Sequence, residues 1–176
     1  MNWYEQAFSQ TYLDVYAHRT DQQAQFEISF VNKHFHFQSH HVVLDICCGA
    51  GRHSFALAPF VDLVVGFDLS LELLAVCAKE NLLKKCRNIF WQKGDMLQLD
   101  YSNSFDFILN FFNSFGYFES EIENETVLKK IFHALAPKGK VFMELMNKPY
   151  VLDKLVPASE KTVNNLLIKE NRKITK

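Results

Sequence analysis

The chain of 176 residues is 48% hydrophobic and has a formal net charge of −1, which predicts one domain with one buried core. The near-neutral charge gives no electrostatic basis for binding nucleic acid or a membrane, so neither partner is expected. No apolar stretch approaches the roughly 20 residues that span a bilayer, and the first residues lack the pattern of a signal peptide. The four cysteines do not follow a disulfide framework, which favours reduced thiols and a cytoplasmic location.

The N-terminal part of the chain is expected to be helical. Apolar and aromatic residues recur at steps of three and four over residues 3–31, with Asp21 placed to cap a second helical segment. One interpretation is a pair of amphipathic helices that cover the edge of a sheet. The other is a lid whose Tyr12, Tyr16 and Arg19 face a ligand, and position in the sequence does not separate the two.

The rest of the chain is organised around residues 42–54. There an apolar strand containing Asp45 runs into a turn with Gly49 and Gly51, and the turn runs into a helical pattern. A glycine lets the backbone approach a ligand that a Cβ atom would exclude. A buried strand, a tight loop and a helix start form the unit with which open parallel sheets hold nucleotide-like ligands.

Strand and helix patterns then alternate. Further strands are predicted over residues 63–68, 88–92, 105–110 and 141–145, and helices over 70–85, capped by Ser70, and 123–135. A turn is predicted over residues 137–140, and a last strand over 162–169. The alternation predicts an α/β fold with a doubly wound, mainly parallel sheet. We expect one domain over residues 1–176, with an N-terminal cover or lid (1–40), a core (41–147) and a C-terminal extension (148–176).

Polar side chains follow the predicted strands at the points where they end. Asp68 follows the second strand, where its carboxylate could accept from both hydroxyls of a ribose. Asp95 follows the third strand, where it could accept from the amine of an adenine, with Leu69 or Met96 on the ring faces. Asn110 closes the pocket from the fourth strand. A single aspartate of this kind is as often a cap or turn former, but the series favours a binding crevice at one sheet edge.

Metal binding is not expected. Four histidines fall within residues 34–41, but no cysteine or carboxylate joins them at ligand spacing. Cys47 and Cys48 are adjacent, so their side chains point apart and form a poor chelate.

Five segments together resemble the class I S-adenosylmethionine-dependent methyltransferases. They are the first loop at residues 44–51, the second strand end at 65–70, and the segments 94–96, 105–110 and 135–140. The resemblance extends over about residues 40–147. More loosely, the aromatic N-terminal segment with Arg19 and residues 113–117 resemble one branch of small-molecule methyltransferases.

The resemblance implies a strand order of 3-2-1-4-5, S-adenosylmethionine as cofactor and a small-molecule methyl acceptor. It implies that Asp68 holds the ribose and Asp95 with Met96 the adenine, that Asp45 or a nearby carbonyl faces the ammonium, and that Arg19 or Arg52 pairs with the carboxylate. The expected cofactor-binding residues are Tyr12, Arg19, Asp45, Cys47, Gly49, Gly51, Asp68, Leu69, Asp95, Met96 and Asn110. No catalytic residue is assigned, because Tyr12, Tyr16, His53 and Tyr117 are candidate general bases that packing explains as well.

Two features depart from the family pattern. Cys47 replaces the usual first glycine, which we expect the turn to tolerate if the φ angle of Cys47 is negative. Relatives continue with two further strands that form an antiparallel hairpin at the sheet edge, and the chain is expected to lack part of it. The fifth strand would then expose an edge that could recruit a second copy and form a homodimer.

Two other functions remain open alternatives. A non-catalytic relative would keep the cofactor pocket and lack the acceptor side. An NAD(P)-dependent reductase would share the first loop, but Ser54 replaces the third glycine and Asp45 would lie beside the pyrophosphate. A nucleoside triphosphatase loop is excluded, because no Gly-Lys-Ser or Gly-Lys-Thr follows the glycines.

Overall fold

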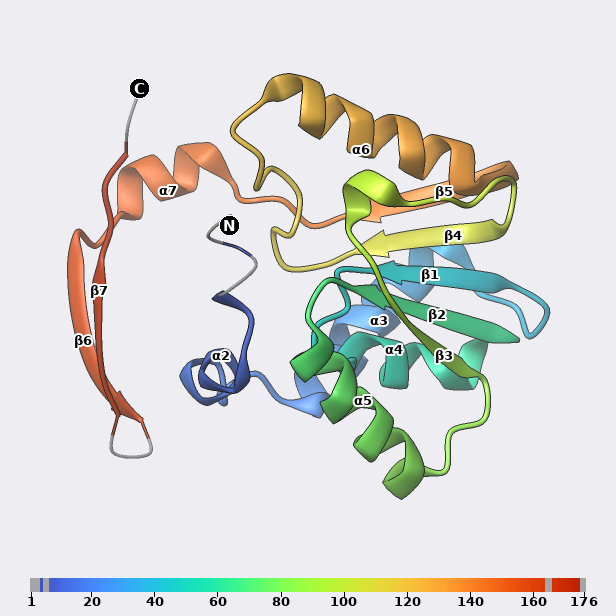
Figure 1. Cartoon of the computed structure of the whole chain (residues 1–176), viewed down its shortest axis with the longest axis horizontal. Helices are drawn as coiled ribbons and strands as arrows, with labels where there is room; N and C mark the ends of the chain where they lie inside the picture. The colour runs from blue at the N-terminus through green and yellow to red at the C-terminus, as the bar shows by residue number, and fades with distance from the viewer. Residues whose placement is uncertain (1–3, 5–6, 164–165, 175–176) are drawn as a thin grey trace.

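A computed structural model describes residue 4, residues 7–163 and residues 166–174. Its centre is a sheet of five parallel strands in the order β3-β2-β1-β4-β5 (Figure 1). The strands are β1 (Val42–Ile46), β2 (Leu63–Asp68), β3 (Ile89–Lys93), β4 (Phe105–Asn110) and β5 (Leu135–Met143). The predicted fold class and strand order are therefore confirmed.

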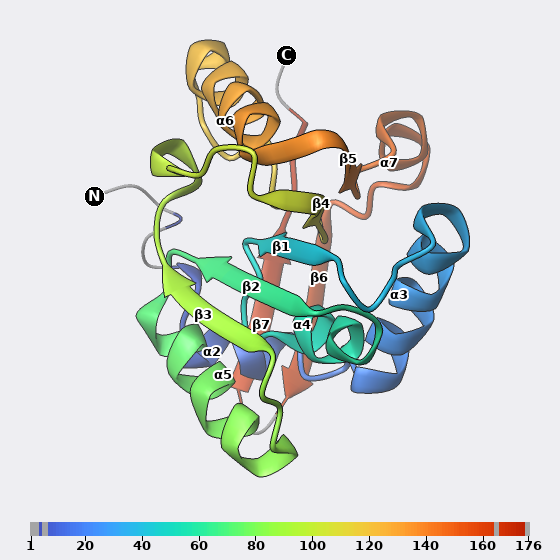
Figure 2. The same ribbon diagram turned by 90° about the vertical axis from the view of Figure 1, so that its right-hand side faces the viewer.

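Helices cover both faces of this sheet, as Figure 2 shows end on. The helices α3 (Asp21–Phe35), α4 (Arg52–Leu57) and α5 (Leu71–Lys84) lie on one side, and α6 (Glu121–Ala134) lies on the other. Neighbouring strand residues serve opposite faces: Val43 packs with α3 and α4, and Leu44 packs with α6. Period-two alternation in a strand buried on both sides produces this division, and both faces are apolar for that reason.

Two helices of the N-terminal region lie wholly within the described residues, and they have different neighbours. They are α2 (Gln10–Val15) and α3, whose Ala24, Ile28 and Val31 are buried. Thr20, not Asp21, is the N-cap of α3, because its side chain accepts from the backbone N–H of Gln23. The side chain of Gln23 accepts in return from the N–H of Thr20, which completes a capping box. The predicted cap at Asp21 was wrong by one residue.

The segment predicted as a turn over residues 137–140 lies inside β5. Pairing with β4 shifts there, because Phe105 is opposite Leu135 and Phe107 is opposite Lys140. Lys138 has a φ of 69°, so the chain does turn locally before pairing resumes. The strand therefore starts six residues earlier than the sequence pattern indicated.

The C-terminal extension contains α7 (Lys148–Lys154) and an antiparallel hairpin of β6 (Ala158–Val163) and β7 (Leu166–Asn171). The single strand predicted over residues 162–169 was wrong, since these residues divide between β6 and β7, and 164–165 lie outside the described residues. The hairpin forms a separate two-stranded sheet and does not extend the main sheet. In Figure 1 the hairpin lies on the side of α2 that is away from the main sheet. In the described part of the chain, no helix combines the length and apolarity needed to cross a membrane.

Candidate functional site

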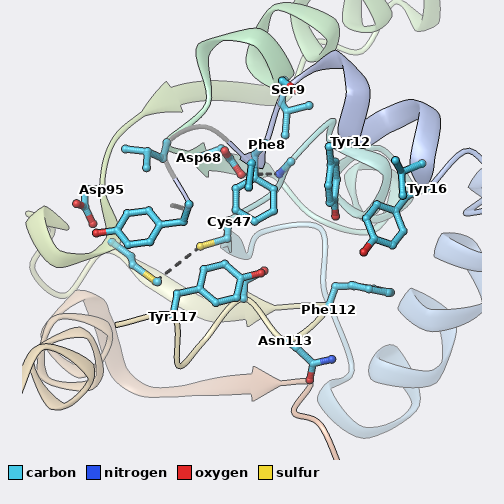
Figure 3. Close-up of a pocket in the computed structure, with 18 of the residues that line it drawn as sticks. Phe8, Ser9, Tyr12, Tyr16, Cys47, Asp68, Asp95, Phe112, Asn113 and Tyr117 are labelled. Atoms are coloured by element: carbon cyan, nitrogen blue, oxygen red, sulfur yellow. Dashed lines mark hydrogen bonds between the residues drawn. The ribbon is translucent and has the colours of Figure 1, made fainter. Parts of the chain in front are cut away.

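A cavity of about 850 Å³ lies at the carboxyl ends of the main strands, where an open parallel sheet binds its ligands. Three walls enclose it, and Figure 3 shows representative residues of each. The strand-end wall, which follows β1, β2 and β3, contains Cys47, Gly49, Asp68, Leu69, Asp95 and Met96. The helical wall contains Phe8, Ser9, Tyr12, Val15, Tyr16 and Arg19. The β4–β5 wall contains Phe112, Asn113, Ser114, Tyr117 and Met146.

The glycine loop begins with a strained residue. Cys47 has a φ of 61°, so the condition under which a side chain was expected to be tolerated here, a negative φ, is not met. The N–H groups of Cys47 and Cys48 both donate to the carbonyl oxygen of Phe67, at 2.7 and 3.1 Å. This pairing turns the chain back over the end of β2 and holds Cys47 in the left-handed region, which is unfavourable for a residue with a Cβ atom. Gly49 follows with a φ of 56° that suits a glycine.

Asp68 connects this loop to the start of α5. Its two oxygens accept separate backbone hydrogen bonds, from the N–H of Gly49 at 2.7 Å and from that of Ser70 at 2.8 Å. The carboxyl group is buried, and burial raises its pKa, although the two hydrogen bonds oppose the increase. The carboxylate is therefore held rigidly at the cavity and keeps acceptor capacity for a ligand.

Asp95 and Met96 form the part of the strand-end wall that follows the end of β3. The carboxylate of Asp95 accepts from the N–H of Leu97 at 2.9 Å and so caps a short 3₁₀ turn at Met96–Gln98. The sulfur of Met96 lies 3.7 Å from the sulfur of Cys47. These contacts place one acidic and two soft apolar side chains side by side, a combination that suits a flat ring carrying a donor group.

The helical wall is built mainly of aromatic contacts. Phe8 packs against Tyr12 and Tyr117, with ring centroids 5.1 and 5.8 Å away. The guanidinium of Arg19 lies 3.8 Å from the ring centroid of Tyr16 and 3.1 Å from that of Phe112, the geometry of cation–π stacking. It also donates to the hydroxyl of Tyr12 at 3.0 Å.

The two interpretations of the N-terminal region therefore apply to different helices. α3 covers the sheet, whereas Tyr12 and Tyr16 from α2 and the following Arg19 line the cavity. A hydrogen bond of 2.7 Å from the hydroxyl of Ser70 to the carbonyl oxygen of Phe8 fixes this segment to the start of α5.

Three of the eleven expected binding residues, Asp45, Gly51 and Asn110, do not line the cavity. Asp45 is buried behind the loop and accepts from the hydroxyl of Ser54 at 2.5 Å, and burial raises its pKa to about 7. Asn110 is buried and donates to the carbonyl oxygen of Ile46 at 3.2 Å. Gly51 starts α4 with a φ of 79°, where an added Cβ atom would lie 2.5 Å from the ring of Trp91. All three support the loop from behind.

Arg52, a candidate partner for the cofactor carboxylate, and His53, a candidate general base, both contact Glu27 outside the cavity. Arg52 forms an ion pair of 3.1 Å with Glu27 and does not line the cavity. His53 stacks on Phe111 at 3.9 Å, and its Nε2 lies 2.6 Å from the same carboxylate. Burial and neighbouring arginines lower its pKa to about 3, so the imidazole is neutral and donates to Glu27 from Nε2. It does not face the cavity as a base.

The other candidate bases, Tyr12, Tyr16 and Tyr117, line the cavity. Burial raises the pKa of Tyr12, and it raises the pKa of Tyr117 to about 12. Both phenols are therefore protonated at neutral pH and act as hydrogen-bonding groups. The described residues contain no group of three or more histidine, cysteine or acidic side chains arranged to hold a metal ion.

The sequence analysis named Tyr12, Tyr16, Arg19 and Tyr117 from the helical and β4–β5 walls and did not assign the other residues of these walls to the site. Ser9 and Val15 lie beside predicted residues on the same helical segment, so the helical period could have indicated them. Phe112 and Asn113 both have positive φ angles, of 67 and 56°. Asparagine tolerates this conformation, but nothing in the sequence marks it at Phe112. Met146 reaches the cavity only because β5 pairs beside β4.

Comparison with known proteins assigns the segment that contains the strand-end wall to a family. Residues 43–139 match a family described as a methyltransferase domain. The 2-phytyl-1,4-naphtoquinone methyltransferase of Synechococcus elongatus is 34% identical over 114 residues, which are 61% of this chain and 47% of that protein. The chain thus spans about half the length of the curated relatives that it matches.

Two solved structures share the fold. A S-adenosylmethionine-dependent methyltransferase from Clostridium acetobutylicum superposes with a TM-score of 0.69 at 18% identity, covering 84% of this chain and 58% of that one. The PH0226 protein from Pyrococcus horikoshii superposes with a TM-score of 0.68 at 20% identity, covering 94% and 79%. Both likenesses concern the fold alone.

Proposed function

The chain belongs to the family of methyltransferase domains, and from this premise we propose that it binds S-adenosylmethionine in the cavity and transfers its methyl group to a small-molecule acceptor. The observation that carries the proposal is the arrangement of Asp68. It is buried at the end of β2, fixed by two backbone N–H groups and adjacent to a glycine loop that leaves room for a ligand. The related naphthoquinone methyltransferase gives one example of an acceptor for such a domain.

The residues of the cavity fit this cofactor in size and chemistry. A volume of about 850 Å³ lies within the range of small-molecule pockets, about 300–1,000 Å³. Asp68 would accept from the ribose hydroxyls, and Asp95 from the adenine amine, with Met96 and Leu69 against the ring. Gly49 would let the backbone approach the methionine part.

Arg19 is the cation placed to hold the carboxylate end. Stacking between Tyr16 and Phe112 keeps its guanidinium plane fixed, and the hydroxyl of Tyr12 satisfies one of its donors. Desolvation lowers the pKa of Arg19 from its usual value without removing its charge. A planar guanidinium held in this way can pair with a carboxylate through its remaining donors.

When bound, S-adenosylmethionine supplies an electrophilic methyl group that the lone pair of the acceptor attacks while the sulfur keeps the bonding electrons. The residues of the chain contribute alignment and exclusion of water, which well-oriented reactants need most. Tyr117 stays protonated at neutral pH and so can orient the acceptor as a hydrogen-bonding group. The proton that an O–H, N–H or S–H acceptor loses on methylation passes to water, since no side chain of the cavity is assigned as a general base.

The test is calorimetric titration with S-adenosylhomocysteine of the parent chain, of Asp68→Ala and of Asp100→Ala. Asp100 is an exposed aspartate and serves as the matched control. We expect micromolar binding by the parent, a loss of about 2 kcal/mol, or roughly thirtyfold, in Asp68→Ala, and no change in Asp100→Ala. Failure of the folded parent to bind, or equal losses in both variants, would contradict the proposal.

Methyl transfer itself is tested with cofactor labelled on the methyl group and a panel of phenols, amines and thiols. A labelled product that the parent chain forms and the Asp68→Ala variant does not form would support an enzyme. Tight binding of S-adenosylhomocysteine without transfer to any compound would favour the alternative, a binding relative that lacks activity.

A further inference from the structure

The cavity has two chemically different halves. The half next to β1, β2 and β3 holds both of its acidic side chains, Asp68 and Asp95, which are assigned above to the cofactor. The other half is formed by residues that follow β4 and β5, namely Phe112, Asn113 and, further along, Met146. If the proposed function holds, an acceptor must occupy this second half.

The second half contains one polar group that lacks a partner. The side-chain oxygen of Asn113 is buried and has no hydrogen-bond partner among the described residues. Glu144 fixes the loop beneath it, because its carboxylate accepts from the N–H of Phe112 at 3.1 Å and its carbonyl oxygen from that of Asn113 at 3.2 Å. Two successive residues with positive φ are held there at a cost in strain, which is typical of functional loops. The free oxygen is suited to accept from an O–H or N–H group.

A second hollow of about 730 Å³ opens between α7 and the end of β7. Its wall is mostly hydrocarbon and includes Tyr150, Val151, Leu155, Val156 and Ile174. Tyr150, Val156 and Ile174 are 64, 57 and 51% exposed, so this apolar groove lies open to water. Exposure of this much contiguous apolar surface to water is unfavourable, and an apolar ligand bound in the groove would remove the surface from water.

Two of the three cations that line this groove are already paired. Lys154 forms an ion pair of 2.9 Å with Asp153. Arg172 pairs with Glu170 and also donates to the hydroxyl of Ser159. These two charges are thus compensated. Lys173 also lines the groove and forms no ion pair among the described residues, so one exposed cation borders a wall that is otherwise mostly hydrocarbon.

Met146 lines both the cavity and the groove, and it is 61% exposed. It lies in the connection between β5 and α7, so the two hollows meet at this residue. Methionine is a flexible apolar side chain that adapts to a passing chain without leaving a polar group unsatisfied.

Resting on the proposed function, we propose that the methyl acceptor is amphipathic. Its head carries an O–H or N–H group that donates to the side-chain oxygen of Asn113. Its hydrocarbon tail leaves the cavity past Met146 and lies in the groove between α7 and β7.

The test is calorimetric titration with 1-hexanol, 1-octanol and 1-decanol in the presence of saturating S-adenosylhomocysteine. Each alcohol supplies a donor head and a tail of known length. If the tail is buried in the groove, each added pair of methylene groups tightens the dissociation constant roughly tenfold. An equal affinity for all three alcohols, or displacement of 1-decanol by S-adenosylhomocysteine, would overturn the proposal.

Matched variants locate the tail. Val156→Asp puts a charge into the groove, and Leu167→Asp puts the same charge on β7 outside it, at a residue of similar exposure (59%). We expect Val156→Asp to weaken 1-decanol binding tenfold or more and Leu167→Asp to leave it unchanged. Equal effects of the two variants would contradict a tail in the groove.

A third variant locates the head. Asn113→Ala should weaken 1-octanol and 1-decanol by the same factor of about threefold, because it removes one hydrogen bond whatever the tail length. No loss of affinity in Asn113→Ala would overturn the proposed contact of the head. The affinity of each variant for S-adenosylhomocysteine, measured alone, separates failure of this inference from failure of the proposed function.

Discussion

The strand-end wall of the cavity is formed by residues at the buried ends of β1, β2 and β3. The helical wall, which includes α2, covers it from the opposite side. In the strand-end wall, Asp68 is buried and its backbone hydrogen bonds join the glycine loop to α5. In the helical wall, no described side chain of α2 is buried, and contacts between rings and one hydrogen bond from Ser70 hold the segment. The first wall is part of the folded core, whereas the second can change with little effect on the core.

This difference predicts that a change in the strand-end wall, or at the buried residues behind it, shifts the free energy of unfolding, whereas a change in the helical wall mainly affects binding. The variants below test it in order of expected size. Each is measured by chemical unfolding, with binding of S-adenosylhomocysteine as a second readout.

Gly51→Ala should have the largest effect. Its Cβ atom would lie 2.5 Å from the ring of Trp91, and its φ of 79° disfavours any side chain. Strain and overpacking together should lower the free energy of unfolding by about 3 kcal/mol. Gly116→Ala is the matched control, because Gly116 has a φ of 92° but no atom within 4 Å of an added Cβ, and it should lose only about 1 kcal/mol. Equal losses would show that packing behind the loop does not matter.

Asp45→Asn tests the buried carboxyl group behind the same wall. Its folded pKa of about 7 lies above the ordinary 3.8, so between these values the folded chain keeps a proton that the unfolded chain has lost. Raising the pH through this window therefore lowers the stability of the parent, and the loss is complete above about pH 7. Asparagine cannot ionise, so the variant should be more stable than the parent by about 2 kcal/mol at pH 8 and by little at pH 4.

Unfolding curves at pH 4, 6 and 8 check this prediction. Asp62→Asn, at an exposed residue, serves as the control and should follow the parent at every pH. A constant difference between Asp45→Asn and the parent over this range would mean that the folded carboxyl group ionises normally.

Substitution at Cys47 measures the strain of its positive φ. Cys47→Ala and Cys47→Gly both remove the sulfur that lies beside Met96, but only glycine relieves the left-handed backbone. We expect the glycine variant to be more stable than the alanine variant by about 1 kcal/mol. If alanine is the more stable of the two, the loop does not hold residue 47 at positive φ in solution.

Tyr12→Phe should have the smallest effect on stability, since it removes one half-buried hydrogen bond to Arg19. The free energy of unfolding should fall by less than about 1 kcal/mol. Affinity for S-adenosylhomocysteine should fall a fewfold, because Arg19 loses a partner that orients it. A loss of stability as large as that of Gly51→Ala would remove the distinction between the two walls.

The strand-end wall could be predicted well from the sequence, because it depends on local patterns. Asp68 and Asp95 are visible as acids after apolar runs, and parallel strands bring their carboxyl ends to one edge. The α2 segment was predicted as helical, but whether it covers the sheet or faces the ligand depends on contacts made across the chain. Ser70 and Phe8, which are 62 residues apart, decide this through one hydrogen bond.

Asp45 and Asn110 show where the sequence pattern misleads. Both sit at strand ends as the cavity-lining Asp68 does, yet both are turned into the protein behind the loop. In a strand, successive side chains face opposite ways, and residues near its end reach either the cavity or the interior according to how the loop folds over them. Cys47 is a similar case, since the double hydrogen bond to Phe67 imposes its φ.

The sequence by itself determined the α/β class, the glycine loop and the acids at the strand ends, because each depends on a pattern of neighbouring residues. The strand order followed from the family resemblance. The tertiary structure alone decided that Asp45, Gly51 and Asn110 stand behind the cavity, that Phe112 and Asn113 line it, and that Met146 joins it to a second hollow. These features depend on which segments pack together, and packing is a property of the whole chain rather than of any one segment.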